Sequence, residues 1–197
     1  MATIRKPIQG QPFNDVLNEL HAHAITGVPD ESDPFILDEL EREYIAYALA
    51  LYYQCDHCQV HHSHAIDRLR VKGATPQWNW REEFLKTILF LRTDRRDISD
   101  AEWAGWLKAW RIFAVHIHYR HPGLACYVAY AIGIARHDEV LMQLAFGSIS
   151  SNNEDHDELL GVVRDIDRLV VFMKAATSKN RTDPIIRSQL RTRGIAV

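Results

Sequence analysis

The sequence predicts an all-α fold, a helical bundle of about seven or eight helices. Apolar residues repeat at spacings of three and four, strand-like alternation is nearly absent, and the 197 residues include only 9 Gly and 7 Pro. The hydrophobic content of 47% is enough for one well-buried core, so the length favours a single domain. No segment reaches the ~18 apolar residues of a membrane span. We therefore expect a soluble cytoplasmic protein that makes no membrane contact.

The helices follow from start and stop signals along the chain. Asp33-Pro34 has the form of an N-cap and a first helical residue, and the apolar repeat after it predicts a helix to about residue 54. The next helix is expected over about residues 55–71, because Gly73 lies just beyond it as a stop signal. Further helices are expected at about 12–24, 79–93, 99–119, 123–135, 138–147 and 155–176.

Shifts in composition divide this single domain into three parts. Residues 1–32 are expected to hold a short helix and a polar linker, and residues 33–177 the helical domain proper. Residues 178–197 are basic and carry no helical repeat, so we expect a loose tail or an arm that lies on a neighbouring subunit. The tryptophan-rich segment 103–110 is expected to be a core helix with a polar rim.

Charge and cysteine count exclude several classes of protein. The formal net charge of −3 argues against a protein that binds nucleic acid through phosphate contacts. Three cysteines are too few for a secreted disulfide scaffold, and in a reducing compartment a Cys-x-x-Cys pair is more often catalytic or metal-binding. Cys126 stands alone in an apolar stretch, so we expect it to be an inert buried thiol.

The segment from Cys55 to His62 carries the residues best suited to chemistry. In a helix, Cys55, Cys58 and His62 share one face, with successive side chains about 5 to 6 Å apart. The two cysteines are spaced i, i+3, which in a helix gives a Cα separation within the ~4.4 to 6.8 Å range of a disulfide, so the two thiols can pair. His62 lies one turn beyond Cys58 and can exchange a proton with it. A helix start and the neighbouring His57 and His61 would lower the thiol pKa values, most at Cys55, which is nearest the N-terminus.

Glu43 is the carboxylate that the helical wheel singles out. It falls near Leu40 and Tyr47, closer to the middle of the apolar face than its acidic neighbours. A half-buried carboxylate beside a histidine is suited to moving a proton near neutral pH, because burial favours its neutral form and an imidazolium its charged form. The alternative is a rim carboxylate that pairs with Arg42 or another base.

These positions resemble the signature of a known family. The motif of the AhpD-like (alkyl hydroperoxide reductase D-like) group, within the carboxymuconolactone decarboxylase superfamily, is a Glu, a Cys-x-His-Cys and a His. The similar positions in this sequence are Glu43, Cys55, His57, Cys58 and His62. The similarity covers about residues 34–76 and includes a Gly73-Ala74-Thr75 turn after the motif helix. It implies an AhpD-like helical bundle that forms a homo-oligomer, usually a trimer or a hexamer.

The resemblance also implies an activity, that of a thiol-dependent peroxidase or disulfide reductase in antioxidant defence. Cys58 would be the thiolate that attacks a peroxide, and Cys55 the more exposed partner that closes the disulfide. Glu43, His57 and His62 would form the proton relay. No bound cofactor or metal is implied, because electrons would come from an external dithiol such as dihydrolipoamide or from a redox partner protein.

Other functions stay open at this point. A structural zinc site could use Cys55, Cys58 and one of the nearby histidines at 61, 62 and 64, although a fourth ligand is missing. A decarboxylase is the second alternative, but relatives with that activity need no redox dithiol. A non-catalytic helical module is the third. The histidines expected to be ordinary surface or rim residues are His21, His23 and His64.

Overall fold

The computed structural model describes residues 13–26, 35–70, 80–118, 121, 123–152 and 155–192. Within these residues there are eight α-helices and no strand, which confirms the all-α class and the expected number of helices. The helices are α1 (Phe13–His21), α2 (Glu39–Tyr53), α3 (Asp56–Arg70), α4 (Trp80–Arg92), α5 (Asp100–His118), α6 (Leu124–Arg136), α7 (Glu139–Asn152) and α8 (His156–Thr192). A π-helix, Ala22–Thr26, follows α1, and a 3-10 helix, Arg95–Asp97, precedes α5.

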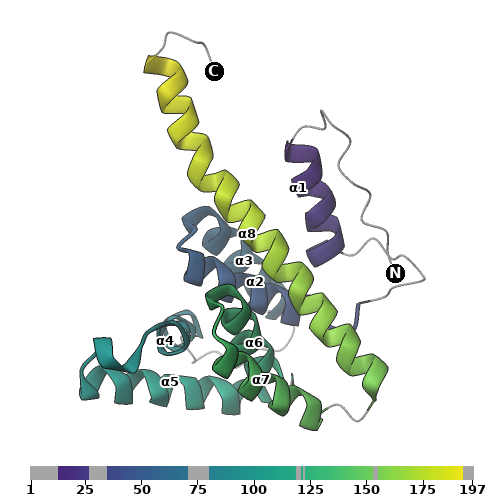
Figure 1. The fold of residues 1–197 in the computed structure, drawn as a ribbon, viewed down its shortest axis with the longest axis vertical. Coiled ribbons are helices and arrows are strands. Elements are labelled where there is room, and N and C mark those ends of the chain that lie inside the picture. The colour runs from purple at the N-terminus through teal and green to yellow at the C-terminus, as the bar shows by residue number, and fades with distance from the viewer. Residues whose placement is uncertain are drawn as a thin grey trace.

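The long helix α8 runs obliquely through the molecule, with α1 on one side and the α2–α3 pair on the other (Figure 1). The α4–α5 and α6–α7 pairs lie together at one end, below α2 and α3. Among the described helices, none combines the length and the apolar composition needed to cross a membrane.

Helix α2 lies at the centre of the core. Every residue from Arg42 to Leu51 is buried, so the helix is enclosed on all sides rather than along one stripe. Small residues at 46, 48 and 50 allow α3, α6 and α8 to approach closely. Tyr44 packs its ring against Phe84 and Phe113, with centroids 5.6 and 6.3 Å away. Any side chain on α2 between residues 42 and 51 is therefore held in a water-poor environment.

Helix α2 begins later than the sequence signal indicated. Its N-cap is Asp38, and the side chain of Asp38 accepts a hydrogen bond from the Glu41 amide at 2.8 Å. The Glu41 carboxylate in turn accepts the Asp38 amide at 3.0 Å, which completes a capping box. The expected start at Asp33-Pro34 was wrong in this respect, because the reciprocal cap satisfies two amides and outweighs the Asp-Pro signal. Residues 33 and 34 themselves lie outside the described residues.

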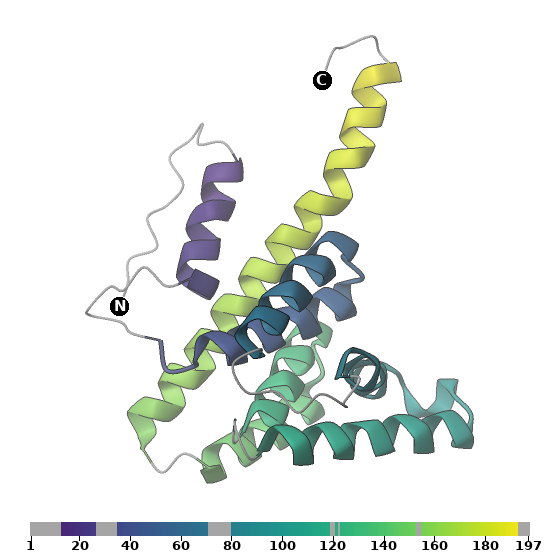
Figure 2. The same ribbon diagram turned by 180° about the vertical axis from the view of Figure 1, so that it is seen from behind.

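Helix α8 is much longer than expected. The sequence predicted its end near residue 176 and a loose tail from 178, whereas the helix continues to Thr192. Its C-terminal part extends beyond the other helices (Figure 2). Adding a residue to an existing helix costs far less than nucleating one, which favours continuation of α8 beyond its packed N-terminal half. Pro184 opposes this continuation, because it lacks the amide that would donate to the preceding turn.

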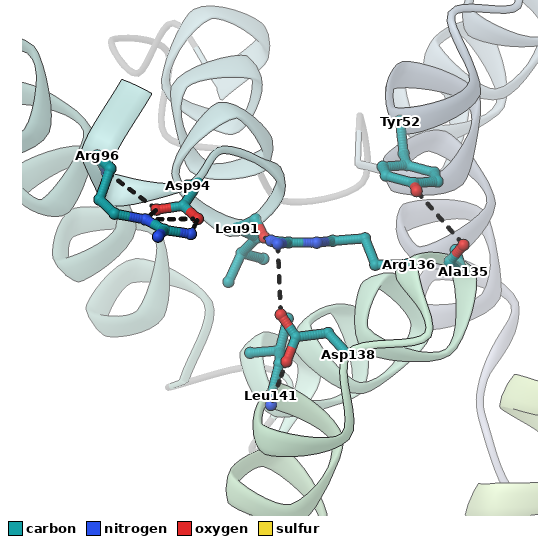
Figure 3. A network of polar contacts seen from close by, with 8 residues as sticks. All are labelled: Tyr52, Leu91, Asp94, Arg96, Ala135, Arg136, Asp138 and Leu141. Atoms are coloured by element: carbon teal, nitrogen blue, oxygen red, sulfur yellow. Dashed lines mark hydrogen bonds and ion pairs between the residues drawn. The ribbon is translucent and has the colours of Figure 1, made fainter. Parts of the chain in front are cut away.

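The junction between the helix pairs is made by polar contacts around Arg136 (Figure 3). At the end of α6, Arg136 donates to the carbonyl of Leu91 on α4 and pairs with Asp138 at 3.3 Å. Asp138 also accepts the amide of Leu141 at 3.0 Å and so caps α7. The Tyr52 hydroxyl donates to the carbonyl of Ala135 at 3.3 Å. These bonds hold the α4–α5 and α6–α7 pairs against α2.

The tryptophan-rich part of α5 is only partly a core element. Trp103, Trp106 and Trp110 are each half-buried. The ring of Phe90 on α4 lies 4.5 Å from that of Trp103 and 6.3 Å from that of Trp110. The expectation of a core helix therefore holds for one face of α5, the face that packs on α4.

Candidate redox site

The turn between α2 and α3 places the two cysteines. Gln54 ends α2 in the left-handed region, with φ of 56°, and its amide bonds back to the carbonyls of Ala50 and Leu51. The Cys55 amide also donates to the Ala50 carbonyl, at 3.0 Å. The chain therefore folds back on α2 before α3 starts, and Cys55 is brought against the core.

Cys55 and Cys58 form a disulfide at the start of α3, with a Cα separation of 5.3 Å. The Cys55 carbonyl accepts the Gln59 amide at 2.9 Å, so Cys55 is the N-cap residue of the helix. Its sulfur lies 3.4 Å from the amide nitrogen of Cys58, which donates to it. The pair has the arrangement of a Cys-x-x-Cys redox motif, with the first sulfur at the positive end of the helix.

The expectation that Cys55 is the more exposed sulfur was wrong. Cys55 and Cys58 each expose 4% of their surface. The reason is the tight turn at Gln54, which folds Cys55 under the end of α2. Reduction of the disulfide therefore needs either a slender reductant or a local opening of this turn.

Glu43 on α2 and His62 on α3 form a buried pair, and His62 lies one helical turn beyond Cys58. Nδ1 of His62 donates to Oε2 of Glu43 at 2.8 Å, and the two side chains are 3% and 5% exposed. The rim alternative for Glu43 is therefore wrong, since Arg42 donates instead to the carbonyls of Ile25 and Leu37. With Nδ1 occupied, Nε2 is the His62 nitrogen left for chemistry.

His57, the remaining residue of the expected relay, is exposed on the first turn of α3. His64 is also exposed, as expected, on the last turns of the same helix. The structure thus brings together Glu43, His62 and the disulfide, and places His57 at the surface beside them. The turn expected at residues 73–75 lies outside the described residues.

Two further histidines adjoin the site, and sequence reasoning gave neither of them a role in the relay. The ring of His61 lies 5.0 Å from that of His62, nearly perpendicular to it. The ring of His21, at the end of α1, lies 6.3 Å from that of His61. His21 was expected to be an ordinary surface residue. No spacing rule relates it to α3, because 40 residues separate it from His61, and only the packing of α1 brings the two together.

Burial controls the electrostatics of these two histidines. It lowers the pKa of His21 and, more than any other cause, the pKa of His61 as well. The neighbouring His62 lowers both pKa values further, whereas Glu43 raises them. Both rings are therefore biased toward the neutral form at neutral pH.

Cys126, the third cysteine, is set apart from this chemistry. It is half-buried on α6, and burial raises the pKa of its thiol despite an interaction with Ser148. The sequence predicted a buried thiol, whereas Cys126 is only partly buried. A thiol with a raised pKa carries little thiolate near neutral pH.

The candidate zinc site is not assembled around the cysteines. Within the part of the chain that the structure describes, one group of three or more metal-ligating atoms lies within 4.8 Å, formed by Asp38, Glu41 and His121. These residues surround the N-terminus of α2 and already interact with one another. His121 Nδ1 lies 3.2 Å from Asp38 and 3.6 Å from Glu41, and its hydrogen bond to Asp38 raises the pKa of His121 to about 9.

Comparison of the chain with protein-family models, with curated proteins and with solved structures finds no match.

Proposed function

We propose that this protein is a thiol-dependent oxidoreductase that reduces peroxides or disulfides through the Cys55–Cys58 pair, as the resemblance to the AhpD-like group implies. One observation supports this proposal above the others. Glu43 and His62 form a buried pair, and His62 lies one turn beyond the disulfide at the start of α3. A disulfide used only for stability would gain nothing from a sealed acid–base pair beside it. Buried titratable pairs of this kind are typical of sites that move protons.

In the peroxidase cycle, the Cys58 thiolate attacks the O–O bond of a hydroperoxide. One oxygen stays on sulfur as a sulfenic acid, and the other leaves as an alcohol after taking a proton from His62. The Cys55 thiol then displaces the sulfenic oxygen as water, and the disulfide forms. An external dithiol such as dihydrolipoamide returns two electrons and two protons, so the cysteines are thiols again.

The two cysteines have different chemical support for their roles. The Cys58 sulfur is one turn from His62, so a base and a proton donor are at hand. The Cys55 sulfur accepts the Cys58 amide at the N-terminus of α3, which stabilises a thiolate there without a base. We assign the attack to Cys58, because the departing oxygen must be protonated, and the resolving step to Cys55.

The experiment combines thiol counting with a coupled assay of peroxide consumption. The reduced protein, treated with one equivalent of an alkyl hydroperoxide, should lose two thiols and yield a peptide linked between Cys55 and Cys58, while Cys126 stays reduced. Turnover with dihydrolipoamide should stop in Cys58→Ser. In Cys55→Ser, a first oxidation should still occur and end as a sulfenic acid on Cys58.

Cys126→Ser is the matched control and should turn over like the wild type. Stoichiometric zinc without a 55–58 link would instead favour the structural zinc alternative. Reversible disulfide formation without peroxide consumption would leave disulfide reduction as the function of the pair.

A further inference from the structure

The buried His62 has no direct path to water of its own. The residue is 3% exposed, and its Nδ1 is bonded to Glu43, which is 4% exposed. A proton that enters or leaves His62 during each turnover must therefore pass through a neighbouring group. His61, the adjacent residue of α3, is partly covered by its neighbours but still reaches solvent, and its ring meets that of His62 edge to face at 5.0 Å.

A second ring holds His61 from the other side. His21, at the last residue of α1, lies between His61 and the Phe172 ring of α8, at 6.3 and 5.3 Å, with an edge-on arrangement in both contacts. The N-terminal helix thus places one ring between α3 and α8, next to the candidate active site.

The position of His21 is set by the same helix that carries Glu43. After His21 the chain forms the π-helix Ala22–Thr26, a rare element that is frequent at functional sites. Arg42 donates from Nε to the carbonyl of Ile25 in this π-helix at 3.0 Å. Arg42 is buried and directly precedes Glu43 in α2. Adjacent residues of α2 therefore anchor the His21 segment and the His62 ring.

We infer that His61 passes protons between His62 and water when the disulfide is reduced, and that His21 is a positioning residue for the His61 ring. The inference rests on the proposed redox function of the Cys55–Cys58 pair and extends its proton relay to two residues outside the family motif. Each gap between rings can be closed by a side-chain rotation or by one bridging water.

The charges around His61 suit this role. The titratable groups that act on it come from three helices, Glu43 of α2, His62 and His57 of α3, and His21 of α1. On the other side of His21, helix α8 contributes the apolar ring of Phe172. Burial and His62 lower the pKa of His61, so its neutral ring can take a proton from water and release it to His62.

His62 supplies its proton when a dithiol reduces the Cys55–Cys58 disulfide. A dithiol loses two protons and two electrons and becomes a cyclic disulfide. Its first thiolate attacks the Cys55 sulfur and breaks the Cys55–Cys58 bond, and Cys58 leaves as a thiolate. His62 protonates this thiolate, and His61 then restores the proton on His62 from water. The second thiol of the dithiol then attacks the mixed disulfide, breaks its bond to Cys55 and gives its own proton to the departing Cys55 sulfur, so both cysteines end as thiols.

The test measures reduction of the oxidised full-length protein by dithiothreitol in weak buffer, followed by quenching with an alkylating reagent. His61→Gln removes the titratable ring and should slow formation of the Cys58 thiol roughly tenfold or more, and added imidazole should restore the rate. His21→Phe keeps a ring against Phe172 and should give a smaller loss. The double variant should be no slower than His61→Gln, because both residues serve one path.

His64→Gln is the control, an exposed histidine of the same helix, and should react like the wild type with no response to imidazole. A wild-type rate in His61→Gln across about pH 6 to 9 would overturn the inference, as would a slow rate that imidazole does not change. No peroxide is used, so loss of peroxidase activity in the coupled assay would count against the proposed function and leave this result intact.

Discussion

Glu43 is the hydrogen-bond partner of the His62 ring, in the place that water would take at a surface. It accepts the Nδ1 proton, fixes which nitrogen faces the chemistry, and compensates a positive charge on the ring whenever one forms. Both side chains are almost fully buried, so neither solvent nor salt can substitute for the partner. The pair is therefore sensitive to changes that keep its size and remove its charge.

We expect Glu43→Gln and His62→Gln each to slow peroxide consumption by roughly 10² to 10⁴, the usual cost of losing a general acid or base. The fold should persist, because both glutamine side chains can still form hydrogen bonds. Thiolate formation on Cys58 should shift to higher pH in both variants. The measurement is the rate under saturating dithiol across about pH 6 to 9. If Glu43→Gln matched the wild type, Glu43 would be a structural carboxylate only.

Asp165 on α8 is a second buried carboxylate, with a structural role. It is fully buried and accepts the amides of Ile36 and Leu37 at 2.8 and 3.1 Å, with the guanidinium of Arg168 at 3.6 Å. Asp165→Ala leaves the buried Leu37 amide and the partly buried Ile36 amide without this acceptor and should lower the free energy of unfolding by roughly 2 to 4 kcal/mol. Urea denaturation measures this loss. The exposed Asp167→Ala is the control and should change stability by less than about 0.5 kcal/mol.

At the scale of elements, the N-terminus of α2 is held by charge as well as by its cap. His121, just before α6, reaches both carboxylates of the capping box, Asp38 and Glu41. The cap amides use one oxygen of each carboxylate, and His121 faces the other. A protonated His121 therefore links the start of α6 to the start of the helix that carries Glu43.

This contact should make stability depend on pH. The hydrogen bond to Asp38 raises the pKa of His121 to about 9 from an ordinary value of about 6.5. A raised pKa in the folded state means that the contribution is complete below about pH 6.5 and is lost as the pH rises through about 9. We expect His121→Asn to lower the urea midpoint at about pH 6 and to match the wild type above about pH 9. A difference that is constant over this range would contradict the assignment, and His156→Asn, at an exposed position, should show no difference.

At the scale of the whole molecule, helix α7 exposes apolar side chains on one face among the residues that the structure describes. Val140 and Leu144, one turn apart, are each 68% exposed, and a side chain added at Gly147 on the same face would meet no neighbour within 4 Å. Between its first and last residues α7 carries no charge. Exposed apolar stripes of this kind are typical of surfaces that bind another protein.

We expect the protein to form a homo-oligomer that uses this stripe, a trimer or a hexamer by its resemblance to the AhpD-like group. Leu144→Glu would bury an unpaired charge in the contact and should weaken self-association by at least about tenfold. Light scattering at micromolar concentration measures the mass. Leu85→Glu, at an exposed apolar position of α4, should leave the mass unchanged. A wild-type protein that is strictly monomeric at this concentration would refute the expectation.

The amino-acid sequence was sufficient to predict the class of the fold and the local arrangement of the site. Helical periodicity and the break at Gly73 placed α3 within one residue of its observed ends, and the i, i+3 spacing allowed the Cys55–Cys58 disulfide. The helical wheel put Glu43 on the apolar face of α2, where it is buried. These features depend on contacts within one or two helical turns, so spacing along the chain is sufficient to predict them.

Which distant groups meet at that site depends on how the helices pack against one another. The burial of Cys55 depends on how α2 and α3 fold together at Gln54, and the pairing of Glu43 with His62 on the register between the two helices. The approach of His21 depends on α1 packing against α8. Each of these contacts joins separate helices, and their relative placement is set by the packing of many side chains, which no local repeat along the chain encodes.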